Sequence, residues 1–363
     1  MTLDDLPVRE DLRGQSPYGA PQPDVAVRLN TNENPFAPDD EIVASIVDRL
    51  SVTVSGLNRY PDRDATELRA ALARYVNQRC GVEVGPGQVW AANGSNEVLQ
   101  QLLQAFGGPG RTALGFEPSY AMHRLISRGT STAFVGVPRT ERFELTADLV
   151  RRAVADHDPD VVFLCSPNNP TGDVVSADVV ETACEASRAM VVVDEAYAEF
   201  SSSPSATALL AGHERLVVVR TLSKALQLAG ARIGYLVADQ GVVDAVQLVR
   251  LPYHLSSLTQ AVGLAALEHA PALLQWVDAL TDERARMVAA LTDLGFDVYP
   301  SEGNFVFFGG IADQEALWHS LLDASVLVRD VGIPGHLRVS AGTPEETTAF
   351  IDAVRTITKE SAA

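Results

Sequence analysis

The chain has 363 residues, of which 46% are hydrophobic, so it can bury a large core that divides into two lobes. Its formal net charge of −19 argues against a nucleic-acid partner, and no apolar run approaches the roughly 18 residues that a membrane span needs. The 3 cysteines lack metal-site spacing and no basic, apolar leader opens the sequence, so we expect a cytoplasmic protein.

The predicted elements begin with an acidic, proline-containing arm. From about residue 41 to 258, strand-like and helical patterns alternate, which indicates a mostly parallel sheet covered by helices on both faces. A long periodic stretch over 258–294 is expected to bridge two lobes. Short apolar runs then predict a small second sheet, and a final helix is expected near 344–357. The expected division is an arm over 1–40, a large domain over 41–275 and a small C-terminal α/β domain over 276–363.

Polar residues follow three apolar strands of the large domain, where each strand ends. Asn169 lies beyond the first, Asp194 and Tyr197 follow the second, and Lys224 follows the third. These positions are 25 and 30 residues apart, about one strand-helix-strand unit each. Because neighbouring parallel strands share one rim at their carboxyl ends, we expect the four side chains to converge on one ligand. The three strands are 161–165, 190–193 and 216–219.

Lys224 is the expected chemical centre. It follows a β-branched run, and a second cation, Arg232, comes later in the chain, directly before a second apolar stretch at 233–237. Burial near other cations disfavours the charged form of a lysine and frees its lone pair for covalent chemistry. The alternative is an ordinary lysine that begins a helix and faces water.

An anion site is expected where the strand 89–92 ends. Gly94, Ser95 and Asn96 follow that strand and precede a helical pattern, so free backbone N–H groups and the helix dipole favour an anion there. Ser223 and Arg232 add further donors for a phosphate. The alternative is a plain helix cap by Ser95 or Asn96.

The ligand that uses a lysine, a carboxylate and amide or hydroxyl donors together is pyridoxal 5'-phosphate. In these motifs the chain resembles the fold-type I aminotransferases, which depend on that cofactor: Asn169–Gly172, Asp194 with Tyr197, and Ser223–Lys224 with Arg232. More narrowly, it resembles the histidinol-phosphate aminotransferases of that family. The segments that carry the narrower resemblance are 29–35, 58–62, 251–256 and 337–343.

The resemblance implies a large domain with a mostly parallel seven-stranded sheet, a smaller α/β domain and a homodimer. It also implies transfer of an amino group between L-histidinol phosphate and 2-oxoglutarate, which gives imidazole-acetol phosphate and L-glutamate in histidine biosynthesis. The partners are then small molecules, with no nucleic acid, membrane or metal.

The resemblance also assigns roles at the cofactor. Lys224 is the covalent attachment point and the proton carrier, and Asp194 pairs with the ring nitrogen. Tyr197 and Asn169 hydrogen-bond the phenolic oxygen. Tyr120 stacks on the ring, with core packing as its alternative.

Further residues are expected to bind the substrate or to complete the site from a partner subunit. The resemblance gives Arg338 to the substrate anion, because a guanidinium suits both a carboxylate and a phosphomonoester. Arg329 is a second candidate for the phosphate end, with a salt bridge to Asp330 as the alternative. Tyr18 and Asn32 are expected in the same pocket. Tyr60 is expected to reach the partner subunit's cofactor phosphate.

Two departures from the family pattern and three rival functions stay open. Leu226–Gln227 replaces an aromatic-glycine pair, and His123 replaces a tyrosine, so His123 is either a contact for the substrate imidazole or structural. The nearest rival is an aromatic amino-acid aminotransferase on the same fold. A phosphoamino-acid decarboxylase and a non-catalytic regulator that binds pyridoxal phosphate are the others.

Overall fold

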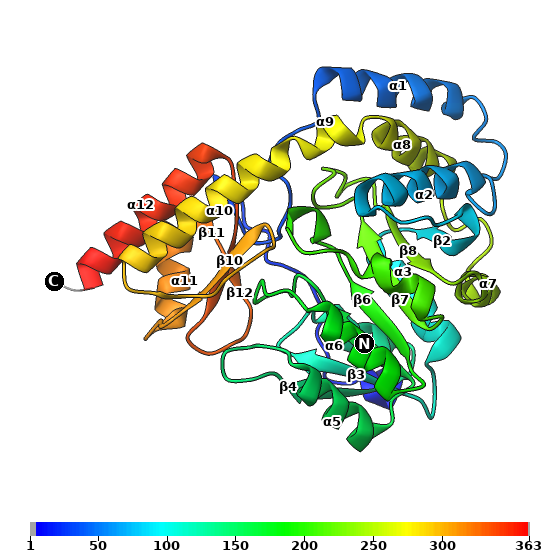
Figure 1. The fold of residues 1–363 in the computed structure, drawn as a ribbon. Coiled ribbons are helices and arrows are strands. Elements are labelled where there is room, and N and C mark those ends of the chain that lie inside the picture. Colours follow the sequence, from blue (N-terminus) through cyan, green and yellow to red (C-terminus); the bar gives the residue numbers. More distant parts are fainter. Residues whose placement is uncertain (1–4, 362–363) are drawn as a thin grey trace.

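A seven-stranded sheet forms the centre of the larger lobe in the computed structural model, which describes residues 5–361 (Figure 1). Strands β3 to β7 run parallel, whereas β8 is antiparallel to its two neighbours, β7 and β2. The predicted mostly parallel seven-stranded sheet is thereby confirmed. In sheet order the strands are β2 (Val89–Ala92), β8 (Gly234–Ala238), β7 (Leu216–Thr221), β6 (Met190–Asp194), β5 (Val161–Cys165), β3 (Thr112–Glu117) and β4 (Ala133–Pro138).

Both faces of this sheet are buried because its strands are apolar at successive positions. Val191 and Val193 face one helical layer and Val192 faces the other, as the two-residue period of a strand requires. One layer contains α3 (Ser95–Phe106), α4 (Met122–Gly129) and α7 (Gln240–Val249). The other contains α5 (Ala147–His157) and α6 (Ala177–Ala186), while α2 (Thr66–Cys80) and α8 (Ser257–Glu268) cover the β2–β8 edge and α1 (Asp40–Val54) packs on α8.

Several helices of this lobe begin at a side-chain cap. Thr146 accepts a hydrogen bond from the Leu149 N–H at the start of α5, and Ser176 accepts one from Val179 at the start of α6. Such a cap stabilises a helix by about 1 kcal/mol. Helix α3 begins at Ser95 instead, after Gly94, which has no side chain to cap it, and this leaves the first N–H groups of the helix for another partner.

The smaller lobe is a second sheet backed by three helices. Its strands, in sheet order, are β12 (Arg329–Asp330), β13 (Leu337–Ser340), β10 (Phe305–Gly309) and β9 (Asp297–Val298). Met287, Phe308 and Phe350 belong to one buried cluster, which joins the sheet to α10 (Trp276–Asp293), α11 (Gln314–Asp323) and α12 (Pro344–Ser361). Figure 1 shows α10 running from the large lobe into the small one, with α12 beside it.

The periodic stretch over 258–294, which is expected to bridge the lobes, is divided into three helices. They are α8, the short α9 (Ala270–Leu274) and α10, and Pro271, which lacks an N–H, lies in the first turn of α9 and separates it from α8. The interruption redirects the chain while α10 still connects the lobes. We propose the domain limits 41–275 and 276–363 on this basis, since α10 begins at residue 276.

Part of the arm over 1–40 belongs structurally to the small lobe. Strand β1 (Val27–Arg28) pairs in parallel with β11 (Val326–Leu327), and Leu29 joins the small-lobe core. This pairing carries residues 30–32 to the junction of the two lobes. Among the described residues, no helix has the length and hydropathy that crossing a bilayer requires.

Candidate active site

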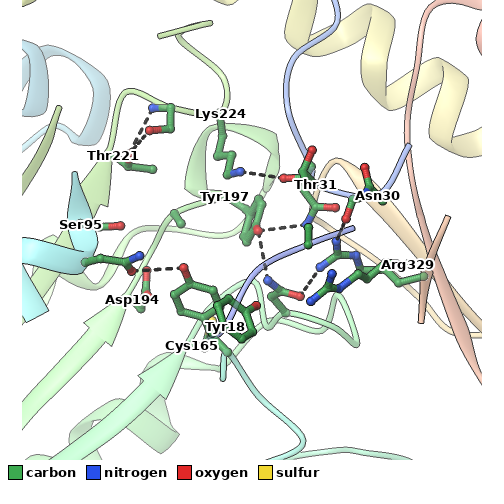
Figure 2. Close-up of a pocket in the computed structure, with 18 of the residues that line it drawn as sticks. Tyr18, Asn30, Thr31, Ser95, Cys165, Asp194, Tyr197, Thr221, Lys224 and Arg329 are labelled. Atoms are coloured by element: carbon green, nitrogen blue, oxygen red, sulfur yellow. Dashed lines mark hydrogen bonds between the residues drawn. The ribbon is translucent and has the colours of Figure 1, made fainter. Parts of the chain in front are cut away.

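A cavity of ≈ 240 Å³ lies where the carboxyl ends of β5, β6 and β7 meet the small lobe (Figure 2). Arm, large lobe and small lobe all contribute to its wall. Thirteen of the residues predicted as site residues line it: Tyr18, Asn32, Ser95, Asn96, Tyr120, Asn169, Asp194, Tyr197, Ser223, Lys224, Arg232, Arg329 and Arg338. Gly94 lies just behind Arg232, and Tyr60 is outside the cavity.

Lys224 is half-buried and its amine is hydrogen-bonded within the site, so the alternative of a lysine that begins a helix and faces water does not hold. Its Nζ donates to the carbonyl oxygen of Thr31 at 3.0 Å, and Figure 2 shows this bond reaching from the large lobe to the arm. Burial, followed by the nearby charge of Arg338, lowers the pKa of Lys224 to about 8. A neutral amine is therefore far more accessible here than on an ordinary lysine.

Asp194 has one carboxylate oxygen engaged and one without a partner. Its Oδ2 lies 3.1 Å from His123 Nε2, whereas its buried Oδ1 has no hydrogen-bond partner in the described part of the chain. An unpaired buried carboxylate oxygen is costly, so this atom indicates a donor supplied by a ligand.

His123 supports Asp194 from behind. Its ring stacks on Phe163 with centroids 4.7 Å apart and meets the edge of Tyr120. The histidine is 3% exposed and is not part of the cavity wall. These contacts favour the structural interpretation over contact with a substrate imidazole.

Tyr197 lies at the centre of an amide network. Asn32 Nδ2 donates to its Oη at 3.0 Å, and Asn169 Nδ2 donates to it at 3.3 Å. Arg338 Nη1 donates in turn to Asn169 Oδ1 at 2.6 Å. Burial raises the pKa of Tyr197 to about 12, which keeps its hydroxyl protonated at neutral pH.

The predicted anion site is built around the uncapped start of α3. Arg232 packs so tightly on Gly94 that a Cβ there would lie 2.5 Å from Arg232 Nη2, and the backbone of Gly94 has a φ of +81°, which favours glycine. The helix has no side-chain cap, so capping by Ser95 or Asn96 is not observed. Asn96 Oδ1 instead accepts a hydrogen bond from Tyr120 at 3.1 Å.

Arg329 and Tyr18 form the outer part of the site. The guanidinium of Arg329 lies over the Tyr18 ring, 5.9 Å from its centroid, and makes no ion pair within residues 5–361. Its alternative partner, Asp330, accepts from Gln314 and from the Gly332 N–H. A second cavity of ≈ 130 Å³ shares Tyr18, Arg329 and Arg338 with the first, so the site extends outward past the arginines.

Tyr60 is on the outside of its own subunit. It is 79% exposed and stacks on Tyr253, with ring centroids 4.4 Å apart. In this chain it therefore contacts none of the residues at the cavity, which agrees with a role toward another subunit.

Several wall residues were not predicted from the sequence. Thr31 and Asn30 act through carbonyl oxygens, which accept from Lys224 and from Arg338, and no residue-type pattern indicates such a role. Thr221, directly at the end of β7, accepts from the Ser223 N–H and could have been found from its position. The departure at Leu226–Gln227 packs behind the lysine, with Leu226 in the core and Gln227 bonded to the Leu273 carbonyl.

These features fit pyridoxal 5'-phosphate. The buried, unpaired Asp194 Oδ1 matches the need of a protonated ring nitrogen, and the cradle of Gly94 and Arg232 leaves room for a phosphate where any side chain on Gly94 would intrude. Lys224 supplies the amine. Within the described part of the chain, no group of His, Cys, Asp and Glu side chains has metal-binding geometry.

Comparison with known sequences gives matches over nearly the whole chain. The family model for class I and II aminotransferases matches residues 24–354. The histidinol-phosphate aminotransferase of Frankia casuarinae is 59% identical over 362 residues, which cover 98% of this chain and 91% of that protein. That of Corynebacterium glutamicum is 55% identical over 360 residues, with 99% and 98% covered.

Comparison with solved structures supports the fold. A crystal structure of histidinol-phosphate aminotransferase from Sinorhizobium meliloti, in complex with pyridoxal-5'-phosphate, matches with a TM-score of 0.82. The two chains are 24% identical, and the match covers 93% of this chain and 92% of that one.

Proposed function

The chain belongs to the class I and II aminotransferases, and on that basis we propose that it is a histidinol-phosphate aminotransferase. The reaction transfers an amino group between L-histidinol phosphate and 2-oxoglutarate and yields imidazole-acetol phosphate and L-glutamate. The observation that supports this proposal best is that Lys224, whose pKa is lowered, and Asp194, which has one unpaired oxygen, line the same cavity, which is rich in cations.

The cofactor is pyridoxal 5'-phosphate, which when bound carries the amino group between the two substrates and accepts the electron pair left at the substrate Cα. Lys224 would hold it covalently and, once released, its neutral amine would move the Cα proton. Asp194 would accept the ring N–H. Tyr197 and Asn169 would orient the phenolic oxygen, and Tyr120 would pack on the ring.

The charges of the cavity favour substrates that carry anions. Lys224, Arg232, Arg329 and Arg338 line it, against Asp194 as the acid of the wall, in a chain whose net charge is −19. Arg232, with Ser95, Asn96 and Ser223 nearby, is suited to the cofactor phosphate.

With Arg232 assigned to the cofactor phosphate, Arg338 and Arg329 are available to bind the anionic groups of the substrates. Burial lowers the pKa of Arg338 to about 10, so the guanidinium stays charged at neutral pH, and among the described residues it has no carboxylate partner. We assign Arg338 to the carboxylate of glutamate and to the phosphate of histidinol phosphate, with Arg329, Tyr18 and Asn32 beside it.

We also propose a homodimer in which Tyr60 completes the partner's site. The support is the exposure of Tyr60 on its own subunit and a set of exposed apolar side chains on α1 and after it. That set comprises Val43, Val47, Val52, Val54 and Leu57. Mixing Lys224→Ala with Tyr60→Ala subunits should restore activity, because one of the two mixed sites then contains both residues; no restoration after subunit exchange would contradict this role.

The proposed compartment is the cytoplasm. The support is the unpaired state of the cysteines: Cys80, Cys165 and Cys184 are all free thiols in the structure. Fractionation of the producing cells tests this placement.

The substrate proposal is tested by a coupled assay. Purified holoenzyme is given 2-oxoglutarate with either histidinol phosphate or phenylalanine, and kcat/KM is compared. We expect preference for histidinol phosphate, and Arg329→Leu should lower kcat/KM for it by about 10- to 100-fold while phenylalanine changes less. Preference for phenylalanine in the unchanged chain would favour the aromatic aminotransferase instead.

The covalent assignment has an unusually clean test, because the lysines of this chain are Lys224 and Lys359 alone. Borohydride reduction of the holoenzyme followed by peptide mapping should place the cofactor on the peptide that contains Lys224. A tag on Lys359 only, or none, would contradict the assignment.

A further inference from the structure

Asn32 is held between the small lobe and Tyr197. It is 1% exposed and has a left-handed backbone with a φ of +54°. Its Oδ1 accepts from Ser340 Oγ on β13 at 2.8 Å, and its Nδ2 donates to Tyr197 Oη at 3.0 Å. Both polar ends of this side chain are thus engaged by the protein.

The direction of these bonds is fixed by chemistry. The backbone N–H of Asn32 donates to Ser340 Oγ at 2.9 Å, so the serine acts as acceptor there and has its single hydrogen left for Asn32 Oδ1. Asn32 must therefore present its NH₂ group, and not its carbonyl, to Tyr197.

A second amide is oriented independently. Arg338 can only donate, and its Nη1 bonds to Asn169 Oδ1 at 2.6 Å, which turns Asn169 Nδ2 toward Tyr197 Oη at 3.3 Å. The hydroxyl oxygen of Tyr197 thus accepts two hydrogen bonds. Within residues 5–361, no acceptor bonds to the hydrogen of the Tyr197 hydroxyl. This hydrogen is therefore free to point into the cavity.

We propose that Asn32 is a positioning residue that fixes the Tyr197 hydroxyl as a hydrogen-bond donor into the active-site cavity. The inference rests on the proposed function, since the acceptor there is the phenolic oxygen of the cofactor. Asn32 belongs to the arm and Ser340 to the small lobe, so both must be seated on the large lobe for the hydroxyl to be oriented. Arg338 and Asp194 are charged side chains that act electrostatically on that hydroxyl.

The test is Asn32→Asp, which replaces the donor by an acceptor of the same shape. The Tyr197 hydrogen is then drawn to residue 32, and the cofactor's phenolic oxygen loses a donor that stabilises its negative charge. In substrate-free holoprotein, the pH midpoint of the cofactor's visible absorption change should rise by about one unit. This spectrum is measured without turnover.

The charge of the new aspartate is separated from the hydrogen-bond effect by a double-mutant cycle. In a Tyr197→Phe background, Asn32→Asp should shift the midpoint by less than half as much, because no hydroxyl remains to be redirected. An equal shift in both backgrounds would overturn the proposal. Asn77→Asp is the matched control, since Asn77 bridges only the backbone of Val84, and it should leave the midpoint unchanged.

Ser340→Ala gives a second route that introduces no charge. Without its serine, Asn32 can rotate its amide, and the midpoint should rise by a smaller amount in the same direction. Borohydride trapping on Lys224 is run with each variant. A variant that is trapped normally but titrates like the unchanged protein would overturn the role of Asn32 and leave the proposed function standing.

Discussion

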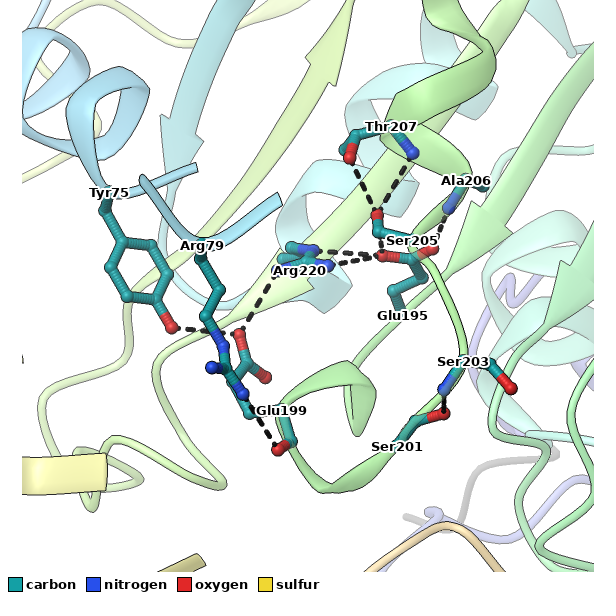
Figure 3. A network of polar contacts seen from close by, with 10 residues as sticks. All are labelled: Tyr75, Arg79, Glu195, Glu199, Ser201, Ser203, Ser205, Ala206, Thr207 and Arg220. Carbon is teal, nitrogen blue, oxygen red and sulfur yellow. Dashed lines mark hydrogen bonds and ion pairs between the residues drawn. The ribbon is translucent and has the colours of Figure 1, made fainter. Parts of the chain in front are cut away.

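Two clusters of charged side chains meet at the segment that follows β6, and they differ in whether their cations have carboxylate partners. In the cluster of Figure 3, Arg220 pairs with Glu195 at 2.7 Å and with Glu199 at 3.3 Å. Tyr75 and Ser205 donate to the same carboxylates. Although burial alone would lower it, the two glutamates raise the pKa of Arg220 well above its ordinary value. This cluster therefore supplies its buried cation with carboxylate partners from within the protein.

In the cavity of Figure 2, several charged side chains lack a partner of opposite charge in the part of the chain that the structure describes. Burial lowers the pKa of both Lys224 and Arg338; within residues 5–361 neither has a carboxylate partner, and Asp194 keeps one oxygen unpaired. Glu195 directly follows Asp194 in sequence, so one short segment serves both clusters. The difference indicates that buried charges with partners of opposite sign stabilise the fold, whereas those without such partners are available to bind a ligand.

The largest expected effect is that of Lys224→Ala. Removing the amine eliminates both the covalent attachment and the proton carrier, so turnover should fall by about 10⁴-fold or more, with weaker cofactor retention. Steady-state kinetics and the cofactor content after dialysis measure both. The matched control is Lys359→Ala, an exposed lysine on α12, which should leave both unchanged. Near-normal turnover of the Lys224 variant would refute the assignment.

Arg220→Met tests the other cluster. It leaves two buried carboxylates without their counter-charge, which should cost about 3–5 kcal/mol of unfolding free energy. Denaturant titration measures this loss. Arg151→Ala is the control, because Arg151 pairs with Asp148 on the surface and its loss should cost less than about 0.5 kcal/mol. A change in activity without loss of stability in Arg220→Met would contradict the division between the clusters.

Asp194→Ala should act on chemistry more than on the fold. Without the carboxylate the ring nitrogen loses its counter-anion, and turnover at saturating cofactor should fall by about 10²–10³-fold. The melting temperature, measured alongside, is expected to change little, since one of the two oxygens is unpaired in the structure. Unaltered kinetics would count against its role.

The sequence could predict the strands of the large sheet and the polar residues at their ends, because β-branched runs and rim positions are local patterns. Lys224, Asp194 and Asn169 meet in the cavity as expected. The same reasoning could not predict β1, whose two residues form a strand only because β11 lies beside them. Strand β4 was missed as well, since it is half exposed and contains Gly136.

Contacts through the backbone were also beyond sequence reasoning. The carbonyl of Thr31 accepts from Lys224 across 193 residues of chain, and every residue type carries such a carbonyl. The pairing of His123 with Asp194 likewise depends on how α4 packs on the central sheet, where it contacts β3 and β4. Side-chain type indicates what a residue can do, whereas the fold decides which neighbour it meets.

The smallest effect expected is the pH dependence of cofactor capture, which measures the lowered pKa of Lys224. Cofactor-free protein should capture pyridoxal 5'-phosphate at a rate that rises about tenfold per pH unit and flattens above about pH 8, because only the neutral amine reacts and burial lowers the pKa of Lys224 to about 8. Stopped-flow absorbance measures the rate. Arg338→Gln removes a charge that lowers this pKa and should move the plateau to higher pH, whereas Glu33→Gln removes one that raises it and should move the plateau to lower pH. If the rate of the unchanged protein were still rising at pH 10, the pKa of Lys224 would be that of an ordinary solvent-exposed lysine, and the prediction would be wrong.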